Sequence, residues 1–378
     1  MLEHAMRAAL TAAGARLLQA VLATDDDGYA GPHARCGNGH QAGYAGCRDK
    51  TITTVPGPVR VARAWYHCGE CGCGFAPRDQ QLGVAGMPLS PGLAQMIARA
   101  GAEVPSGKAA GLLADLAGVS VSAGTVERSA EASGAAARAA GAAGGAAIRE
   151  RRIRPLPPKE PVPDMLYIEA GDTGVPVRPG EAGGRRGKGE DGTARTREIK
   201  LARFFTVSGL DDDGSPVMDP GSSSYVATFG GKRHPRRAGR GRVPAPRRRP
   251  LPPGRQWLED RNTELGDGDT EAIIAAARQY PPAGVKTDEL DKKLGYFEHN
   301  LHRMRYAHFK KPGMFIGSGA IEGAIKAIAV QRAKQSGTHW ATAGAAGIIA
   351  PRCQHASGRW AEPWTTRAAT PAGLQAAI

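Results

Sequence analysis

The cysteines of this chain are crowded into one short region, and that crowding limits the folds open to its N-terminal part. Five of the six lie between Cys36 and Cys73. Cys68 and Cys71 have the two-residue spacing of a zinc knuckle, and Cys36 and His40 flank a turn-like Gly–Asn–Gly. We predict a structural zinc site, because four protein ligands leave no open position for catalysis. The predicted ligands are Cys36, His40, Cys68 and Cys71, with His33, Cys47 and Cys73 as substitutes, and free thiols in a small core are the simpler explanation.

A β-hairpin is predicted between the two halves of that site. Thr51–Val55 and Val59–His67 are rich in β-branched and aromatic residues, and Pro56–Gly57 between them is a turn signal. Before this module, Ala5–Leu22 carries alanine, leucine and valine on one side, which predicts a helix.

Helices are predicted for the region that follows. One begins at Ser106 and runs to Leu116, a turn covers Gly118–Ser122, and a second helix spans Ala123–Ala132. This is the outline of a helix-turn-helix, although a plain αα-hairpin fits it about equally well. The second helix carries Arg128 on a polar face suited to a DNA groove. A stretch rich in alanine and glycine then leads into a proline-rich linker.

Three antiparallel strands are predicted beyond the linker, at Met165–Ala170, Ile199–Val207 and Ser224–Phe229. The first ends at a Gly–Asp–Thr–Gly segment that contains Asp172. Three consecutive strands with an acid at the end of the first are the opening of a ribonuclease-H-like sheet.

A loop at Gly317–Gly319 precedes a predicted helix with one buried face. The apolar residues that recur at helical spacing are Ile321, Ala324, Ile325 and Ile328. Glu322 falls in the first turn, where the helix dipole favours an acid, and a divalent metal is one partner for such a carboxylate. The cationic flank that follows suits a phosphate backbone and consists of Lys326, Arg332 and Lys334. An ordinary amphipathic helix is the simpler interpretation.

The charge of the chain favours a polyanionic partner, most simply nucleic acid, and double-stranded DNA is the partner implied by the family resemblance given below. Its 378 residues include 50 Lys+Arg and 36 Asp+Glu, for a formal charge of +14. Residues 231–255 hold ten of the cations, six prolines and no acid, so they are not expected to form strands or a core. We interpret them as out-of-frame translation followed by a deletion.

The setting predicted for the chain is the bacterial cytoplasm, in association with the nucleoid. The cysteine pattern is not that of a secreted disulfide scaffold. There is no signal-peptide pattern, and no apolar run approaches the about 18 residues that span a bilayer.

Several short motifs, taken in order, resemble one protein family. They include Asp49–Lys50–Thr51, Tyr66–His67–Cys68–Gly69–Glu70–Cys71–Gly72, Thr173–Gly174–Val175–Pro176, Thr196–Arg197–Glu198–Ile199–Lys200–Leu201, Gly317–Ser318–Gly319 with Glu322, Lys334–Gln335–Ser336–Gly337 and Ser357–Gly358–Arg359–Trp360. Together they are similar to bacterial insertion-sequence transposases of the DDE type, in the Kra-type family with a zinc-binding N-terminal region. The resemblance covers most of 33–229 and 257–364.

The resemblance implies a ribonuclease-H-like domain in which two aspartates and a glutamate hold two Mg²⁺ ions for phosphodiester cleavage and strand transfer. Glu322 takes the glutamate position. The family has Asp–Gly–Thr–Gly where this chain has Gly171–Asp172–Thr173–Gly174, so Asp172 is the candidate for the first aspartate with its position shifted by one. The second aspartate is missing from the interval occupied by 231–255, and Asp267 is the candidate replacement.

We therefore expect an α+β multidomain chain. The expected order is an N-terminal helix plus zinc-binding β module at 1–84, a helix-turn-helix-like region at 85–145, a linker at 146–164, a ribonuclease-H-like domain with a helical insertion and C-terminal helices at 165–364, interrupted at 231–255, and a tail at 365–378. The expected function is a DNA transposase, degenerate in this copy, that acts as a homo-oligomer on DNA. Two rival functions are a non-catalytic repressor of its own element and a ribonuclease-H-like nuclease acting on RNA.

Overall fold

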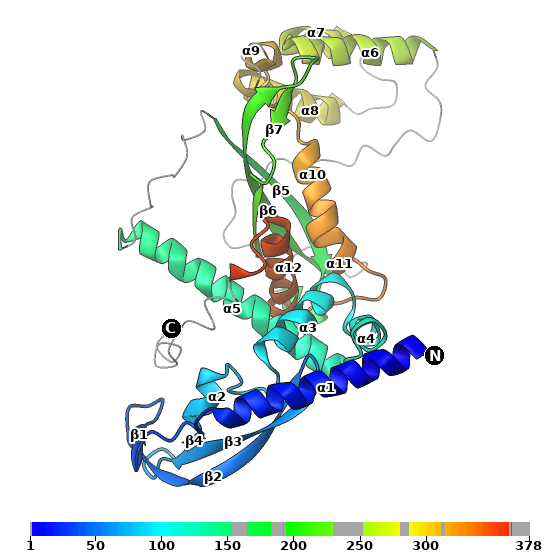
Figure 1. The fold of residues 1–378 in the computed structure, drawn as a ribbon. Coiled ribbons are helices and arrows are strands. Elements are labelled where there is room, and N and C mark those ends of the chain that lie inside the picture. Colours follow the sequence, from blue (N-terminus) through cyan, green and yellow to red (C-terminus); the bar gives the residue numbers. More distant parts are fainter. Residues whose placement is uncertain are drawn as a thin grey trace.

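The N-terminal part of the chain is built on a four-stranded antiparallel sheet (Figure 1). In this computed structural model the described residues are 2–152, 165–182, 192, 194–229, 252–279, 287–310, 314–362 and 364. The strands lie in the order β1 (His33–Arg35), β2 (Gln41–Thr54), β3 (Gly57–His67) and β4 (Gly74–Phe75). The predicted hairpin is therefore confirmed, and its turn places Gly57 at a φ of +130°, which a residue with a side chain rarely adopts.

Helix α1 (Leu2–Thr24) lies along this sheet. The short helix α2 (Pro77–Gln81) comes directly after β4 in the chain. Leu18 and Leu22 of α1 pack against a small core that contains Val59 and Val61. Arg78 is buried and donates hydrogen bonds to the carbonyls of Ala62 and Leu22, which ties α2 to β3 and α1.

The middle of the chain is a helical layer formed by α3 (Pro91–Glu103), α4 (Ser106–Leu112), a π-turn η1 (Leu113–Ala117) and α5 (Ala123–Arg149). Their shared core consists of Leu89, Leu93, Ile97, Ala109, Leu113, Val119 and Val126. Gly118 ends the first helix of the pair at a φ of +69°, and Ser122 caps α5 by accepting a hydrogen bond from the Thr125 amide. The predicted helix–turn–helix outline is present.

Helix α5 is much longer than predicted, because it continues through the alanine- and glycine-rich stretch to Arg149. Alanine has the highest intrinsic helix propensity, and α5 gains a partner in α12 (Thr342–Ala356). The remainder of the predicted linker, from 153, lies outside the described residues.

A second sheet forms the centre of the C-terminal part. Strands β5 (Leu166–Pro176), β6 (Thr196–Leu210) and β8 (Ser224–Phe229) pair antiparallel with β6 in the middle, and the short β7 (Pro216–Met218) extends the far end of β6. The three predicted strands are confirmed. The first runs past its predicted end and includes Asp172.

One face of this sheet is covered by helices (Figure 1). They are α10 (Gly319–Ala324), the π-turn η4 (Ile325–Val330), α11 (Gln331–Ala333) and α12. The predicted apolar face of the Glu322 helix is buried there, with Ile321 and Ile328 each 4% exposed. Val175, Ile199 and Leu201 meet it from the strands.

Helices α5 and α12 cross at very short range, and this contact joins the middle of the chain to the C-terminal sheet. A Cβ atom added to Gly134 would lie 1.7 Å from the carbonyl oxygen of Gly347 and 2.5 Å from its Cα. The two backbones therefore touch at this point, where Gly134 leaves no room for a side chain, whereas a Cβ on Gly347 would lie 3.2 Å from the Cα of Glu131.

A group of helices is drawn next to β7, at one end of the second sheet (Figure 1). It consists of α6 (Pro252–Asp267), α7 (Thr270–Gln279), α8 (Thr287–Asn300), the 3-10 turn η3 (Leu301–Arg303) and α9 (Tyr306–Lys310). Helices therefore occupy the region for which a helical insertion was predicted. Another 3-10 turn, η2 (Pro179–Ala182), is not part of this group and lies between β5 and β6. Residues 231–251 and the tail 365–378 lie outside the described residues. Among the described helices, none has the length and hydropathy needed to cross a bilayer.

Candidate metal centre and nucleic-acid interface

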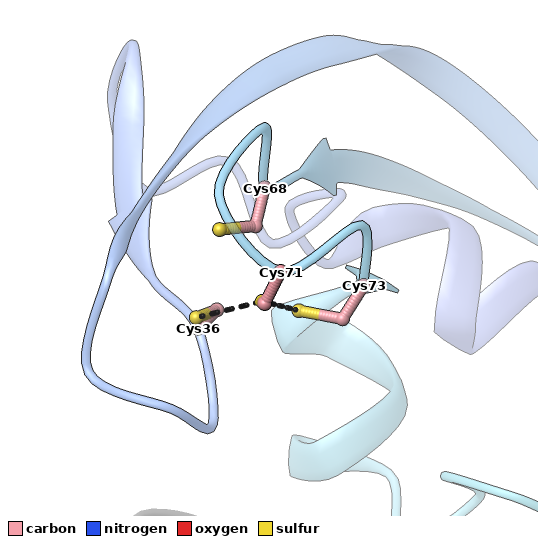
Figure 2. Close-up of side chains that lie close together, drawn as sticks. All are labelled: Cys36, Cys68, Cys71 and Cys73. Carbon is pink, nitrogen blue, oxygen red and sulfur yellow. Dashed lines mark hydrogen bonds between the residues drawn. The ribbon is translucent and has the colours of Figure 1, made fainter.

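Four cysteines from two loops meet at the end of the N-terminal sheet (Figure 2). Cys36 follows β1, Cys68 follows β3, and Cys71 and Cys73 lie in the loop that leads into β4. Each loop is closed by backbone hydrogen bonds of 2.9 Å, from the Cys36 amide to the His40 carbonyl and from the Cys68 amide to the Cys73 carbonyl. The local backbone thus brings the thiols together.

The four sulfur atoms fit a tetrahedral metal. All lie within 4.8 Å of one another, with 3.8 Å between Cys36 and Cys71 and 3.2 Å between Cys71 and Cys73. Zinc–sulfur bonds of about 2.3 Å place the sulfurs of a tetrahedral site roughly 3.8 Å apart, so a small adjustment suffices. Cys36 and Cys68 are buried, which shields the site from water.

The protonation of the cluster also suits a cation. Hydrogen bonds from Cys73 and from His40 lower the pKa of the Cys71 thiol to about 5, whereas the contact with Cys71 raises the pKa of Cys73 to about 12. The two thiols behave as one thiolate that shares a proton with its neighbour. A divalent ion would replace that proton and stabilise both as thiolates.

The fourth member of the cluster is Cys73, one of the predicted substitutes, and not His40. His40 lies beside the cluster, with its Nδ1 3.8 Å from the Cys68 sulfur and its Nε2 4.0 Å from Glu70, whereas Cys73 completes the group of four. The reason is that the loop after Cys71 turns back on itself through Gly72, at a φ of +68°, and returns Cys73 to the other thiols. The side chains of His33 and Cys47, the two remaining predicted substitutes, are exposed and do not belong to the group.

A basic and aromatic surface lies on the same sheet. The guanidinium carbons of Arg48 and Arg63 lie 4.9 Å and 5.4 Å from the centre of the Trp65 ring. Asp79 pairs with Arg63 at 2.6 Å and with Lys50 at 3.0 Å beside a surface pocket of about 330 Å³. Asp79 neutralises part of the charge, so Arg48 is the exposed cation of this surface.

The predicted DNA-contacting cations divide into exposed and buried ones. Arg128 is exposed near the start of α5, and Lys326 is exposed on η4. Lys334 is exposed and donates a 2.6 Å hydrogen bond to the hydroxyl of Thr173. Arg332 is only 4% exposed. It donates to the Gly101 carbonyl, and its guanidinium carbon lies 4.9 Å from the centre of the Trp340 ring.

The prediction that Arg332 contacts DNA is therefore wrong. Arg332 and the buried Arg352 join α11 and α12 to α3, since Arg352 donates to the carbonyls of Ala102 and Ile328. Burial lowers the pKa of Arg332 because the charged form loses solvation. Sequence spacing alone placed Arg332 on the polar flank, whereas the packing of α3 covers it.

Asp172 and Glu322 do not form a shared carboxylate site. A Cβ on Gly171 would lie 2.5 Å from the Cδ1 atom of Ile325, so Gly171 faces the helices that cover the sheet. Asp172, the next residue in the strand, is exposed on the opposite face and is paired in register with Lys200. The strand continues past Asp172 and turns its side chain to the face of the sheet opposite the helices that carry Glu322, because successive residues of a strand face opposite sides.

Glu322 lies in the first turn of α10, exposed, where the Ser318 hydroxyl donates to its Oε1 at 3.1 Å. Asp267 lies at the end of α6 in the helical insertion. In the part of the chain that the structure describes, the thiol cluster is the one group of three or more acidic, histidine or cysteine side chains close enough to hold a metal.

The sequence analysis missed the contact between α5 and α12 and ranked Cys73 only as a substitute ligand. The glycine contact between α5 and α12 left no local signal, because it depends on residues 213 apart in the chain. For Cys73 there was a local signal in the sequence, because its position two residues after Cys71 makes a second short spacing between thiols.

Comparison with protein families, with curated proteins and with solved structures found no match for this chain.

Proposed function

We propose that this chain binds double-stranded DNA through its helical layer and zinc module, and that it descends from a transposase without retaining two-metal cleavage. The observation that carries the binding proposal is the exposed start of α5. The core residues of α3 and α4 hold α5 by its Val126 side, which leaves Glu127 and Arg128 on the solvent side. A short polar helix start held by a second helix is the arrangement that enters a major groove.

The zinc module supports this surface. A structural metal would fix the two loops at the end of the N-terminal sheet, and the exposed Arg48 lies on β2 of that sheet, whereas the exposed Arg60 of β3 is paired with Asp49 at 3.1 Å. The overall charge of +14 supplies a long-range attraction for a polyanion. We infer that the partner is double-stranded DNA, because the pair formed by α4 and α5 presents the start of α5 in a way that suits a major groove.

The absence of cleavage is inferred from the direction of the side chains on β5. Two-metal chemistry needs carboxylates that converge on one point. Gly171 occupies the inward position next to Ile321 and Ile325, and Asp172 points to the other face. A side chain at position 171 would have to displace the end of the Ile325 side chain, whose Cδ1 would lie 2.5 Å from the added Cβ.

Binding is tested by fluorescence anisotropy with a labelled duplex of random sequence, at several salt concentrations. Arg128→Ala is expected to weaken binding about tenfold and to lower the salt slope by about one. Arg138→Ala is the matched control, because Arg138 is exposed on the same helix further from its start. If Arg128→Ala bound the duplex as tightly as the unaltered protein does, α5 would not be part of the DNA interface.

Cleavage is tested on supercoiled plasmid with Mg²⁺ and with Mn²⁺. We expect no nicking by the unaltered protein above the level seen with Glu322→Gln. Nicking that disappears in Glu322→Gln while DNA binding persists would instead establish the second candidate function, an active transposase, in which Glu322 at the start of α10 serves as a metal ligand.

A further inference from the structure

Helix α1 presents an apolar stripe to solvent along its whole length. Five large apolar side chains form the stripe, and their exposed fractions are Leu2 75%, Met6 57%, Leu10 71%, Leu17 67% and Val21 54%. At 100° per residue they fall within roughly 100° of the circumference, and they extend over about 28 Å. The opposite side of α1, with Leu18 and Leu22, packs on the sheet, so the stripe is additional to what the fold requires.

The stripe is self-complementary when a second copy runs antiparallel to it. Leu2 and Val21, Met6 and Leu17, and Leu10 and Ala13 are placed symmetrically about the peptide bond between Thr11 and Ala12. An antiparallel pair therefore sets Leu2 against Val21, Met6 against Leu17, and Leu10 against the small Ala13. A parallel pair would instead set Ala13 against itself and leave a gap at the centre of the seam.

Charge does not oppose this pairing. Arg7 and Arg16 lie on the two flanks of α1, roughly 90° from the centre of the stripe, and Glu3 lies at its edge in line with Val21, where the antiparallel copy presents the uncharged Ala20. The guanidinium of Arg7 also donates to the carbonyls of Asp115 and Leu116. Leu116, whose carbonyl accepts from Arg7, has a side chain that is 75% exposed.

We propose that α1 is a dimerisation element that pairs antiparallel with α1 of a second copy of this chain. The seam is formed by the stripe, and the two N-terminal sheets lie on its outer sides. Such a contact is isologous, so it closes at two copies. This inference does not depend on DNA binding, because it rests on α1 alone.

The first test is the mass of the purified full chain in solution, measured by sedimentation at micromolar concentration. The unaltered protein is expected to be a dimer. Leu10→Lys places two lysines at the centre of the seam and is expected to raise the dimer dissociation constant about 100-fold. Ala12→Lys is the matched control, since Ala12 is exposed on the same helix away from the stripe, and it should leave the dimer unchanged.

A monomeric unaltered protein, as expected if another segment of the same chain covers α1, would overturn the proposal. So would open-ended aggregates in place of a dimer, or a dimer that Leu10→Lys leaves intact. The second test gives the direction of pairing. In a Cys47→Ser background, which removes the exposed cysteine of β2, Met6→Cys with Leu17→Cys should form a disulfide-linked dimer and Met6→Cys alone should not. Linkage by Met6→Cys alone would show a parallel pair and refute the arrangement.

Discussion

The contact between α5 and α12 allows a sharp prediction, because it involves backbone and leaves no flexible group to move aside. In Gly134→Ala the new Cβ would start 1.7 Å from the Gly347 carbonyl oxygen and 2.4 Å from its carbon. An ordinary contact needs about 3.4 Å, so the helices must separate by about 1.7 Å.

That separation determines the size of the effect. A gap of 0.5–1 Å already forfeits a quarter to a half of a dispersion contact, so a larger one removes most of the contact energy along the crossing. Overpacking a core usually costs about 1–3 kcal/mol, and a clash with backbone belongs at the upper end. We expect a loss of about 3 kcal/mol, which lowers the Tm of this part of the chain by about 6–12 °C.

The assay is thermal unfolding followed by circular dichroism at the helical signal, with urea unfolding as a second measurement. Gly141→Ala is the matched control on the same helix, where an added Cβ meets nothing within 4 Å. It should stabilise the chain by about 0.5–1 kcal/mol, because alanine replaces glycine inside a helix. If Gly134→Ala matched Gly141→Ala in sign and size, the helices would not touch as described and the reasoning would fail.

Two further predictions concern the thiol cluster and the β6–β7 hairpin. Cys73→Ala should abolish stoichiometric zinc, measured by elemental analysis of the purified protein, whereas His40→Ala should retain it; the reverse result would restore the histidine as the fourth ligand. Hydrogen bonds from Thr206 and Ser208 lower the pKa of Asp219 in the folded state. The ionised carboxylate therefore stabilises the folded state fully at pH values above its unfolded pKa of about 3.9. This stabilisation is lost as the pH falls through the lower, folded-state pKa. The Tm difference between the unaltered protein and Asp219→Asn should therefore be constant near neutral pH and vanish in acid, and a difference independent of pH would count against this role.

The sequence predicted local structure well wherever a pattern was local. The paired thiols at Cys68 and Cys71, the hairpin before them and the strand at Ser224–Phe229 were all evident from spacing and alternation. The buried face of the Glu322 helix was likewise evident, since Ile321 and Ile328 recur at helical intervals.

The errors arose where a side chain's direction or cover depends on distant residues. Arg332 sits on the flank that spacing assigns to solvent, yet α3 packs over it. The alanine- and glycine-rich stretch became helix because α12 supplies a partner for α5.

By itself, the sequence determined the mixed helix-and-sheet character of the chain, most of its strands and three of the four clustered thiols, because these follow from residues close together along the backbone. Only the tertiary structure decided that Cys73 joins them, that Asp172 turns away from Glu322, and that two glycines 213 residues apart meet. The physical reason is that metal-site geometry, the facing of a strand and the approach of two helices are set by packing between segments, which no local pattern encodes.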